Sequence, residues 1–452
     1  MPDSVADSAG LYIHFPYCVS ICSYCDFDRQ ATGFASIPRY VASVVAEITL
    51  HQRRPVHSIF FGGGTPSLMS PEQVRSILTA ASEQFEVDPA AEITLEANPG
   101  ECTVERLSGF RAAGVNRLSI GVQSLDDQTL TALSRRHTAA EAREALAAAR
   151  AAGFESVNLD FMLGLAGMTV ETWLQTLDGA IALGPEHLSC YVLTVDERVP
   201  MGRDVARGRL LLPSDDAIAD QYLATGERLA QAGFEQYEVS NWAKPGRRSR
   251  HNLTYWRDEP YIGIGAGAAG WHDGTRYKNA PSPRRYMASV AGGRADRVEE
   301  EQPDLTTRLG DALTLGLRLR EGLDVDALGA RLGVDVREVV GPSLDELLAA
   351  GCLEWIDGPD EPPSSAGGGR RLRVAEASIL VTSELLVRLE SALHDRAASL
   401  QIEGQGETAS IETQRQDLTA RLESDHLDRA ASVVADAEAS QQLADLTILA
   451  GR

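Results

Sequence analysis

The feature that most constrains the fold is an alternation of short apolar runs and longer amphipathic stretches between residues 11 and 233. The runs are rich in β-branched residues and the stretches have helical periodicity, which indicates alternating strands and helices. We expect strands at 11–15, 58–61, 92–97, 117–122, 156–163 and 187–194, with helices such as 71–84 and 139–152 between them. Six units are too few for an eight-unit barrel. A parallel, partial (β/α)6 barrel or an open doubly wound α/β sheet remains.

The charge of the chain excludes some classes of partner. Its 452 residues include 42 Lys and Arg against 65 Asp and Glu, a formal net charge of −23. Such an acidic protein is poorly suited to binding nucleic acid or an anionic membrane surface. No uncharged apolar stretch approaches the length of a transmembrane helix, and the first ten residues lack the apolar core of a signal peptide. We therefore expect a cytoplasmic protein without membrane insertion.

The chain is long enough for two or three domains at about 150 residues each. A Gly-rich and aromatic stretch interrupts the alternation after residue 233, and helices resume near residue 304. Further on, a helix at 344–348 and strands at 352–356 and 372–374 resemble a winged helix. The long loop between these two strands should be disordered. We expect a leader at 1–10, a barrel at 11–233, an extension at 234–302, a C-terminal helical, winged module at 303–390, and an acidic helical or disordered tail at 391–452.

Three cysteines lie directly after the first expected strand. Cys18, Cys22 and Cys25 form a CxxxCxxC sequence. In a cytosolic protein such a cluster favours metal or redox chemistry over disulfides. Structural zinc requires four ligands, and the fourth is missing nearby. A [4Fe-4S] cluster held by three thiolates instead leaves one iron open to an exchangeable ligand. A distorted zinc site remains the alternative.

Polar or glycine residues follow several expected strands. Gly62 to Pro66 come after the second strand, Glu96 ends the third, Gln123 the fourth, and Asp160 lies in the fifth. In α/β barrels, catalytic groups collect at the C-terminal ends of the strands. Glycines there would let backbone N–H groups approach an anionic ligand. Each residue alone is commonly a cap or turn residue, but together they predict one site around the cysteine loop.

The sequence LYIHFPYCVSICSYCDF at 11–27 resembles the signature of radical S-adenosylmethionine (SAM) proteins. That resemblance implies a partial barrel, a [4Fe-4S] cluster whose open iron binds SAM, and reductive cleavage of SAM to a deoxyadenosyl radical. In the coproporphyrinogen-oxidase-like branch, the positions that contact SAM match Tyr12, Tyr24, Gly63, Gly64, Thr65, Glu96, Gln123, Arg135 and Asp160. Arg135 would serve a carboxylate of SAM.

A GxGxxG sequence lies at Gly265, Gly267 and Gly270. We reject a dinucleotide-binding interpretation because no helix is expected after it. The surrounding YIGIGAGAAG segment instead resembles a recurring loop beside the SAM pocket of this branch. Ala269 stands where that loop usually has His.

Two functions compete within the branch. Oxygen-independent coproporphyrinogen III dehydrogenases have a further cysteine two residues after the third ligand, where this chain has Phe27. Heme chaperones of the branch have an HNxxYW motif, which 251–256 match fully. This resemblance implies heme binding by His251, Tyr255 and Trp256, whereas without it a buried core histidine would be the simpler interpretation.

The sequence therefore predicts a heme chaperone that passes heme to respiratory proteins. Coproporphyrinogen III dehydrogenase is the alternative, and a redox-inert zinc protein is a third class. We expect the cluster and SAM to support formation of a homodimer or heme transfer. In so acidic a chain, heme propionates need local cations, for which we suggest Arg247, Arg248 and Arg250.

Overall fold

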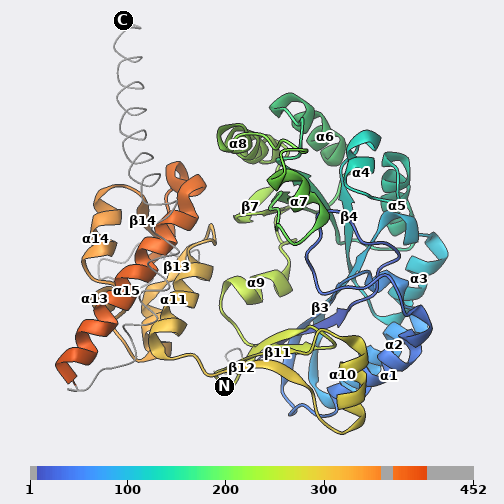
Figure 1. Cartoon of the computed structure of the whole chain (residues 1–452), viewed down its shortest axis with the longest axis horizontal. Helices are drawn as coiled ribbons and strands as arrows, with labels where there is room; N and C mark the ends of the chain where they lie inside the picture. The colour runs from blue at the N-terminus through green and yellow to red at the C-terminus, as the bar shows by residue number, and fades with distance from the viewer. Residues whose placement is uncertain (1–7, 358–369, 405–452) are drawn as a thin grey trace, which may run out of the picture.

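The computed structural model describes residues 8–357 and 370–404 (Figure 1). Its main sheet has twelve strands, and the central six are parallel and follow one another in chain order. They are β1 (Ala9–Phe15), β2 (Pro55–Gly63), β3 (Glu86–Ala97), β4 (Arg117–Gln123), β5 (Val157–Leu163) and β6 (His187–Val192). The six predicted strands are thus confirmed, with ends that differ by up to six residues.

Helices cover the outer face of these strands (Figure 1). They are α1 (Ile37–Ile48), α2 (Pro71–Gln84), α3 (Val104–Ala113), α4 (Asp127–Ala132), α5 (Ala139–Ala151), α6 (Val170–Leu183) and α8 (Asp215–Gln231). A further helix, α7 (Pro200–Ala206), lies against the cysteine loop, where the Met201 N–H donates to the Ser23 carbonyl at 3.0 Å. The two helices named from the sequence are correct to within one residue. Ser70 begins α2 with a capping box that includes Gln73, and Gly153 follows α5 with a φ of 84°.

Short strands extend the sheet at both edges, where the sequence predicted only a break in the pattern. β9 (Tyr261–Ile264) pairs with β1 in parallel, and β10 (Ala269–His272), β11 (Thr275–Asn279) and β12 (Arg297–Glu301) continue outward. At the other edge, β8 (Asn241–Ala243) and β7 (Glu235–Glu238) add to β6. The GxGxxG sequence therefore runs into strand β10 and not into a helix, which supports rejecting a dinucleotide site.

A buried carboxyl group fastens the turn between β9 and β10. Glu47 of α1 accepts hydrogen bonds from the Gly265 N–H at 2.8 Å, Asn279 Nδ2 at 2.7 Å and the Tyr286 hydroxyl at 2.6 Å. Burial raises the pKa of Glu47 to about 7 despite these donors. Asn279 lies on β11 and Tyr286 on α10 (Pro283–Ala291). The Glu47 carboxyl group therefore links α1 to the turn after β9, to β11 and to α10.

The C-terminal part of the chain has its own hydrophobic core. It contains α11 (Leu305–Gly316), β13 (Leu323–Asp324), α12 (Val325–Leu332), α13 (Val336–Val340), α14 (Pro342–Ala349), β14 (Leu353–Asp357), β15 (Arg370–Val374) and α15 (Thr382–Gly404). The helix and two strands expected here coincide with α14, β14 and β15. The predictions for the leader before residue 8, the disordered loop at 358–369 and the acidic tail beyond 404 lie outside the described residues. Among the described residues, no helix is both long and apolar enough to cross a membrane.

A short helix, α9 (Arg250–Trp256), lies between the barrel and the C-terminal module (Figure 1). Its barrel side contacts residues near the beginnings of the parallel strands, including Gly10 of β1, Ser58 of β2 and Glu92 of β3. α9 therefore closes the end of the barrel where the strands begin, which we call the floor. The cysteine loop follows β1 at the opposite end, which we call the mouth.

Candidate functional site

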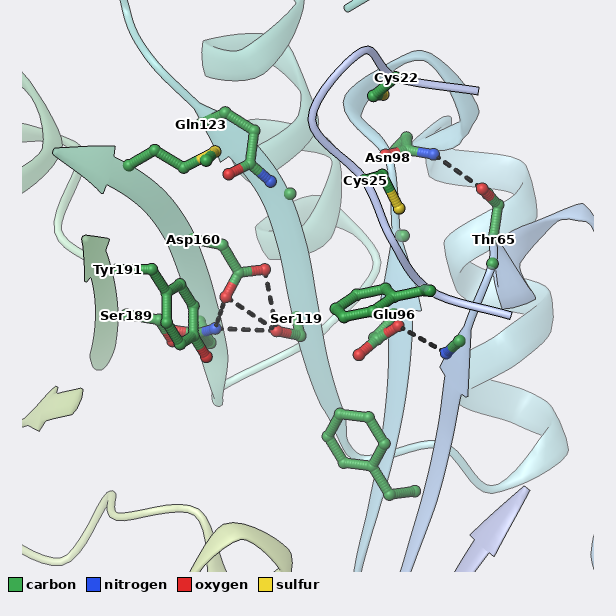
Figure 2. A pocket seen from close by; sticks show the side chains of 18 of the residues that line it. Cys22, Cys25, Thr65, Glu96, Asn98, Ser119, Gln123, Asp160, Ser189 and Tyr191 are labelled. Atoms are coloured by element: carbon green, nitrogen blue, oxygen red, sulfur yellow. Dashed lines mark hydrogen bonds between the residues drawn. The ribbon is translucent and has the colours of Figure 1, made fainter. Parts of the chain in front are cut away.

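The barrel encloses a cavity of about 730 Å³ that extends from the cysteine loop to α9. Part of its lining is shown in Figure 2. The cavity brings together nearly all the residues singled out from the sequence: Tyr12, Cys18, Cys22, Tyr24, Cys25, Gly63, Gly64, Thr65, Glu96, Gln123, Arg135, Asp160, His251 and Tyr255. Trp256, by contrast, packs against a separate cluster that includes Leu253 and Leu319.

The three cysteines are free thiols, partly exposed, on one folded loop. Cys18 accepts a hydrogen bond from the Thr65 hydroxyl at 3.5 Å, and Cys22 accepts one from Arg135 at 3.7 Å. Within the described residues, no three His, Cys, Asp or Glu side chains are placed to hold a single metal ion. A cubane cluster differs, because each thiolate binds its own iron and the ligands need not converge on one point. The three sulfur donors fit such a cluster.

A polar chain joins the cysteine loop to the neighbouring strand ends. Arg135 Nη2 donates to Asn98 Oδ1 at 2.5 Å and to the Gly121 carbonyl at 2.6 Å. Asn98 Nδ2 in turn donates to the Thr65 hydroxyl at 3.0 Å (Figure 2). The Arg135 guanidinium is therefore already held by protein acceptors and helps to position the loop.

The glycines after β2 are needed for close packing. A Cβ at Gly64 would lie 2.7 Å from the Tyr17 carbonyl oxygen, and one at Gly63 would lie 2.5 Å from the His14 ring. Gly63 also has a φ of 107°, which favours glycine strongly. Its N–H donates to Glu96 Oε2 at 3.2 Å. The absence of side chains thus lets β2 approach both the cysteine loop and the cavity wall.

Two partly buried carboxyl groups, Glu96 and Asp160, share the cavity (Figure 2). Burial, together with the charge of Asp160, raises the pKa of Glu96 to about 8. Burial also raises the pKa of Asp160, although hydrogen bonds from Asn158 and Ser119 oppose this shift. Glu96 is therefore mostly protonated at neutral pH, and the cavity carries less negative charge than its composition suggests.

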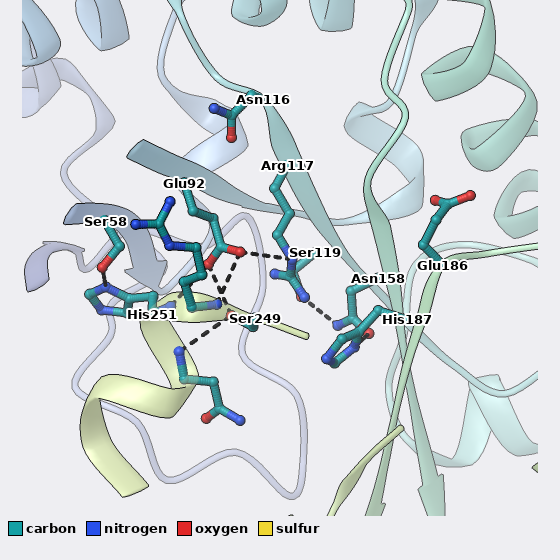
Figure 3. A network of polar contacts seen from close by, with 12 residues as sticks. Ser58, Glu92, Asn116, Arg117, Ser119, Asn158, Glu186, His187, Ser249 and His251 are labelled. Atoms are coloured by element: carbon teal, nitrogen blue, oxygen red, sulfur yellow. Dashed lines mark hydrogen bonds and ion pairs between the residues drawn. The ribbon is translucent and has the colours of Figure 1, made fainter. Parts of the chain in front are cut away.

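Sequence analysis missed the inner polar lining of the cavity. Ser119, Asn158, His187 and Ser189 form a buried network, in which Asn158 Nδ2 donates to Asp160 at 2.7 Å. His187 Nδ1 donates to Asn158 Oδ1 at 2.7 Å (Figure 3). The sequence does contain a pattern that could have identified these residues: polar residues occupy alternate positions within apolar strands, as in Asn158-x-Asp160 and His187-x-Ser189. Period-two positions on a strand share one face, which here is the inside of the barrel.

His251 of the HNxxYW motif is buried, with 1% of its surface exposed. Its Nδ1 is hydrogen-bonded to the Ser58 hydroxyl at 2.9 Å and its Nε2 to the Tyr255 hydroxyl at 2.8 Å. The ring stacks on Phe60 at 5.2 Å. Burial lowers the pKa of His251 to about 3, so the ring is neutral, with one nitrogen donating and the other accepting. In this arrangement the lone pair that axial ligation of heme requires is already used.

The start of α9 is anchored by one carboxylate. Glu92 accepts hydrogen bonds from the Ser249 hydroxyl at 3.1 Å and from the backbone N–H groups of Arg250 and His251 at 3.1 and 3.0 Å (Figure 3). Two of the three arginines suggested for heme propionates are also engaged. Arg248 pairs with Glu321 and Glu235, and Arg250 donates to the Ala90 carbonyl. As placed here, α9 does not fit a heme.

Two family models match the chain. The radical SAM superfamily matches residues 12–180, and the HemN C-terminal domain matches residues 304–358. The heme chaperone HemW of Mycobacterium tuberculosis is 36% identical over 353 residues, which cover 76% of this chain and 88% of that protein. HemW of Escherichia coli is 38% identical over 355 residues, covering 76% and 91%.

The chain belongs to the HemW family. A mitochondrial mouse protein named radical S-adenosyl methionine domain-containing protein 1 is also similar, with 41% identity over 315 residues and 67% coverage of each chain. The solved structure of coproporphyrinogen III oxidase (HemN) from Escherichia coli has a TM-score of 0.71 and 20% identity, covering 85% of this chain and 90% of that one. The predicted fold class, an α/β radical SAM fold with a C-terminal helical module, is confirmed. Membership of the radical SAM superfamily implies a [4Fe-4S] cluster and SAM.

Proposed function

We propose that this HemW-family chain is a heme chaperone that binds heme and delivers it to respiratory acceptor proteins. The main support is its similarity, over about three quarters of its length, to proteins named heme chaperone HemW. The cavity also gathers the cysteines and the residues expected to contact SAM. Phe27 stands where the resemblance would place a further cysteine in the dehydrogenase.

The cavity residues suggest how the cofactors would be held. Cys18, Cys22 and Cys25 would bind the [4Fe-4S] cluster, and Arg135 would keep Cys22 oriented through its hydrogen bond. Glu96 and Asp160 suit hydroxyl groups of SAM because both carboxyl groups line the cavity and can accept hydrogen bonds. When bound, the cluster and SAM supply one-electron chemistry. The protein contributes the residues that position both groups within one cavity.

The remaining expectations belong to the same proposal. We place the protein in the cytoplasm and propose that it forms a homodimer or transfers heme with the help of the cluster and SAM. Residues 11–233 would bind the cofactors, 234–302 would extend the barrel, and 303–390 would form the accessory module.

Anaerobic reconstitution tests the function directly. The reconstituted chain is incubated with heme, passed over a desalting column and assayed for retained heme as the pyridine hemochrome. Conversion of coproporphyrinogen III is measured in parallel with SAM and a reductant. We expect retained heme and no conversion. Conversion without stable heme binding would replace the chaperone function with the dehydrogenase.

The metal is tested by a matched pair of variants. Cys22→Ser should lose most iron and sulfide after reconstitution, because a hydroxyl is a poor iron ligand. Cys352→Ser is the control, since Cys352 packs against the separate core of the C-terminal module. Iron, sulfide and zinc are counted in each protein. Bound zinc without brown absorbance in the unmodified chain would favour the zinc alternative.

A further inference from the structure

Large apolar side chains are exposed on the lining of the cavity at its mouth. Phe27 is 62% exposed and Ile21 45% exposed on the cysteine loop, while Tyr191 and Val192 are 43% and 38% exposed at the end of β6. All four line the cavity. They come from segments about 165 residues apart in the sequence, which the barrel places on two walls of the same opening. We call these four residues the mouth rim.

Exposed apolar side chains indicate a ligand site when they surround one cavity. Apolar side chains scattered singly over a surface need no explanation, but a group of them around a cavity marks a ligand site. The ligand would be one that gains by leaving water, with an apolar face wide enough to reach both walls. Heme has this character: it is a flat, largely apolar macrocycle with two carboxylates on one edge.

A cation beside the rim can receive such a carboxylate. Arg29 lines the cavity near Phe27 and donates from Nη1 to the Phe27 carbonyl at 2.8 Å. Its Nε is buried and has no hydrogen-bond partner among the described residues. In a chain with a net charge of −23, an incompletely paired guanidinium beside an apolar opening complements a propionate.

The floor offers heme no comparable surface. The nitrogens of His251 are both hydrogen-bonded, and Arg248 is paired with carboxylates. Trp256 packs beside Leu319 of the C-terminal module. His251 could ligate heme iron only after the hydrogen bond from one of its ring nitrogens to Ser58 or Tyr255 had broken.

We propose that heme docks on the mouth rim, with its macrocycle between the cysteine loop and the end of β6 and a propionate on Arg29. This inference rests on the proposed heme-chaperone function and assigns its cargo to a place different from the HNxxYW motif. Heme would then lie over the mouth of the cavity that is expected to hold SAM. Transfer to an acceptor would start from an exposed surface and not from the interior.

The test compares heme dissociation constants of the reconstituted chain and its variants, measured by titration with pyridine hemochrome quantification. Phe27→Glu and Val192→Glu should each weaken binding about tenfold or more, because a carboxylate replaces an apolar contact at the centre of the site. Val192 lies on β6, away from the cysteine loop, so its variant should keep normal iron and sulfide. Val298→Glu is the matched control: Val298 is 41% exposed on β12, outside the cavity lining, and its replacement should leave affinity unchanged.

The propionate contact is tested with a modified ligand. Arg29→Gln should weaken binding of heme several-fold but leave binding of heme dimethyl ester unchanged, because the ester carries no carboxylate. An equal loss for both ligands would mean that Arg29 only shapes the loop, and would remove it from the site.

The outcomes separate this inference from the proposed function. If the unmodified chain retains no heme, the chaperone function itself fails. If it retains heme, and both rim variants bind like the control, the mouth rim is not the site. A tenfold loss in His251→Gln with an unchanged unfolding midpoint, beside normal rim variants, would place heme at α9 instead.

Discussion

The two ends of the barrel are built from the same six strands but differ in how their polar groups are used. At the mouth, three free thiols and exposed apolar side chains surround an open cavity. At the floor, α9 seals the strands and the key polar groups are paired within the protein. His187, for example, donates to Asn158 and is hydrogen-bonded to the Tyr237 hydroxyl at 2.8 Å. The same six strands thus carry a closely packed, hydrogen-bonded polar network at the floor and a cavity lined by three free thiols at the mouth.

The largest expected effect is a loss of folding stability when the floor is altered. Glu92→Ala should lower the free energy of unfolding by about 3–5 kcal/mol, because it removes the anchor of α9 and the nearest counter-charge of a buried cation. That cation is Arg117, which is 3% exposed with Nε 3.9 Å from Glu92. Urea unfolding measures the effect.

Glu86→Ala on the same strand is the control. Its partner is Arg53, and both side chains are more than half exposed, so the loss should be below about 1 kcal/mol. Equal losses for the two variants would show that the floor is not a specially paired region.

The next largest expected effect is a change with pH in the affinity of the mouth for SAM. The raised pKa of Glu96, about 8, means that the ligand-free carboxyl group is protonated at neutral pH. Binding of the cationic sulfonium of SAM favours the ionised form, so a proton should be released. Affinity for SAM should therefore rise up to about tenfold per pH unit as the pH approaches 8, and level off above it.

Calorimetric titrations in buffers of different ionisation enthalpy count this proton. Glu96→Gln should abolish the release and flatten the pH dependence. Asp160→Asn removes a charge that raises the pKa of Glu96, so the plateau should begin at lower pH. Proton uptake, or no pH dependence in the unmodified chain, would contradict this assignment.

The smallest effect concerns the outer side of the floor, where the C-terminal module meets the loop after α9. Arg331 of α12 donates to the Asp258 carboxylate at 2.8 Å and to its carbonyl oxygen at 2.9 Å. Because the pair is only partly buried, Arg331→Ala should cost about 1 kcal/mol. Urea unfolding measures the loss. Arg53→Ala, which removes one partner of the exposed Arg53–Glu86 pair, is unfolded in parallel for comparison. A loss of several kcal/mol would mean that the module contributes more to sealing the floor than this contact indicates.

Much of the mouth could be predicted because its signals are local. The cysteines follow one strand directly, and Glu96, Gln123 and Asp160 lie at or near strand ends, so the alternation of elements was enough to bring them together. The extension strands could not be predicted, since β9 and β10 have four residues each, one of which is glycine. Strands this short carry too little periodicity to be recognised.

The sequence by itself determined the positions of the six central strands, the cysteine loop and the polar strand ends at Glu96, Gln123 and Asp160, because these depend on periodicity and on the parallel arrangement of strands. Only the tertiary structure decided the place of α9. This seven-residue helix is held by contacts 159 and 193 residues distant in the chain, to Glu92 and Ser58. No local pattern encodes such partners. The family resemblance therefore suggested His251 as a heme ligand, whereas in the fold both of its nitrogens are already hydrogen-bonded.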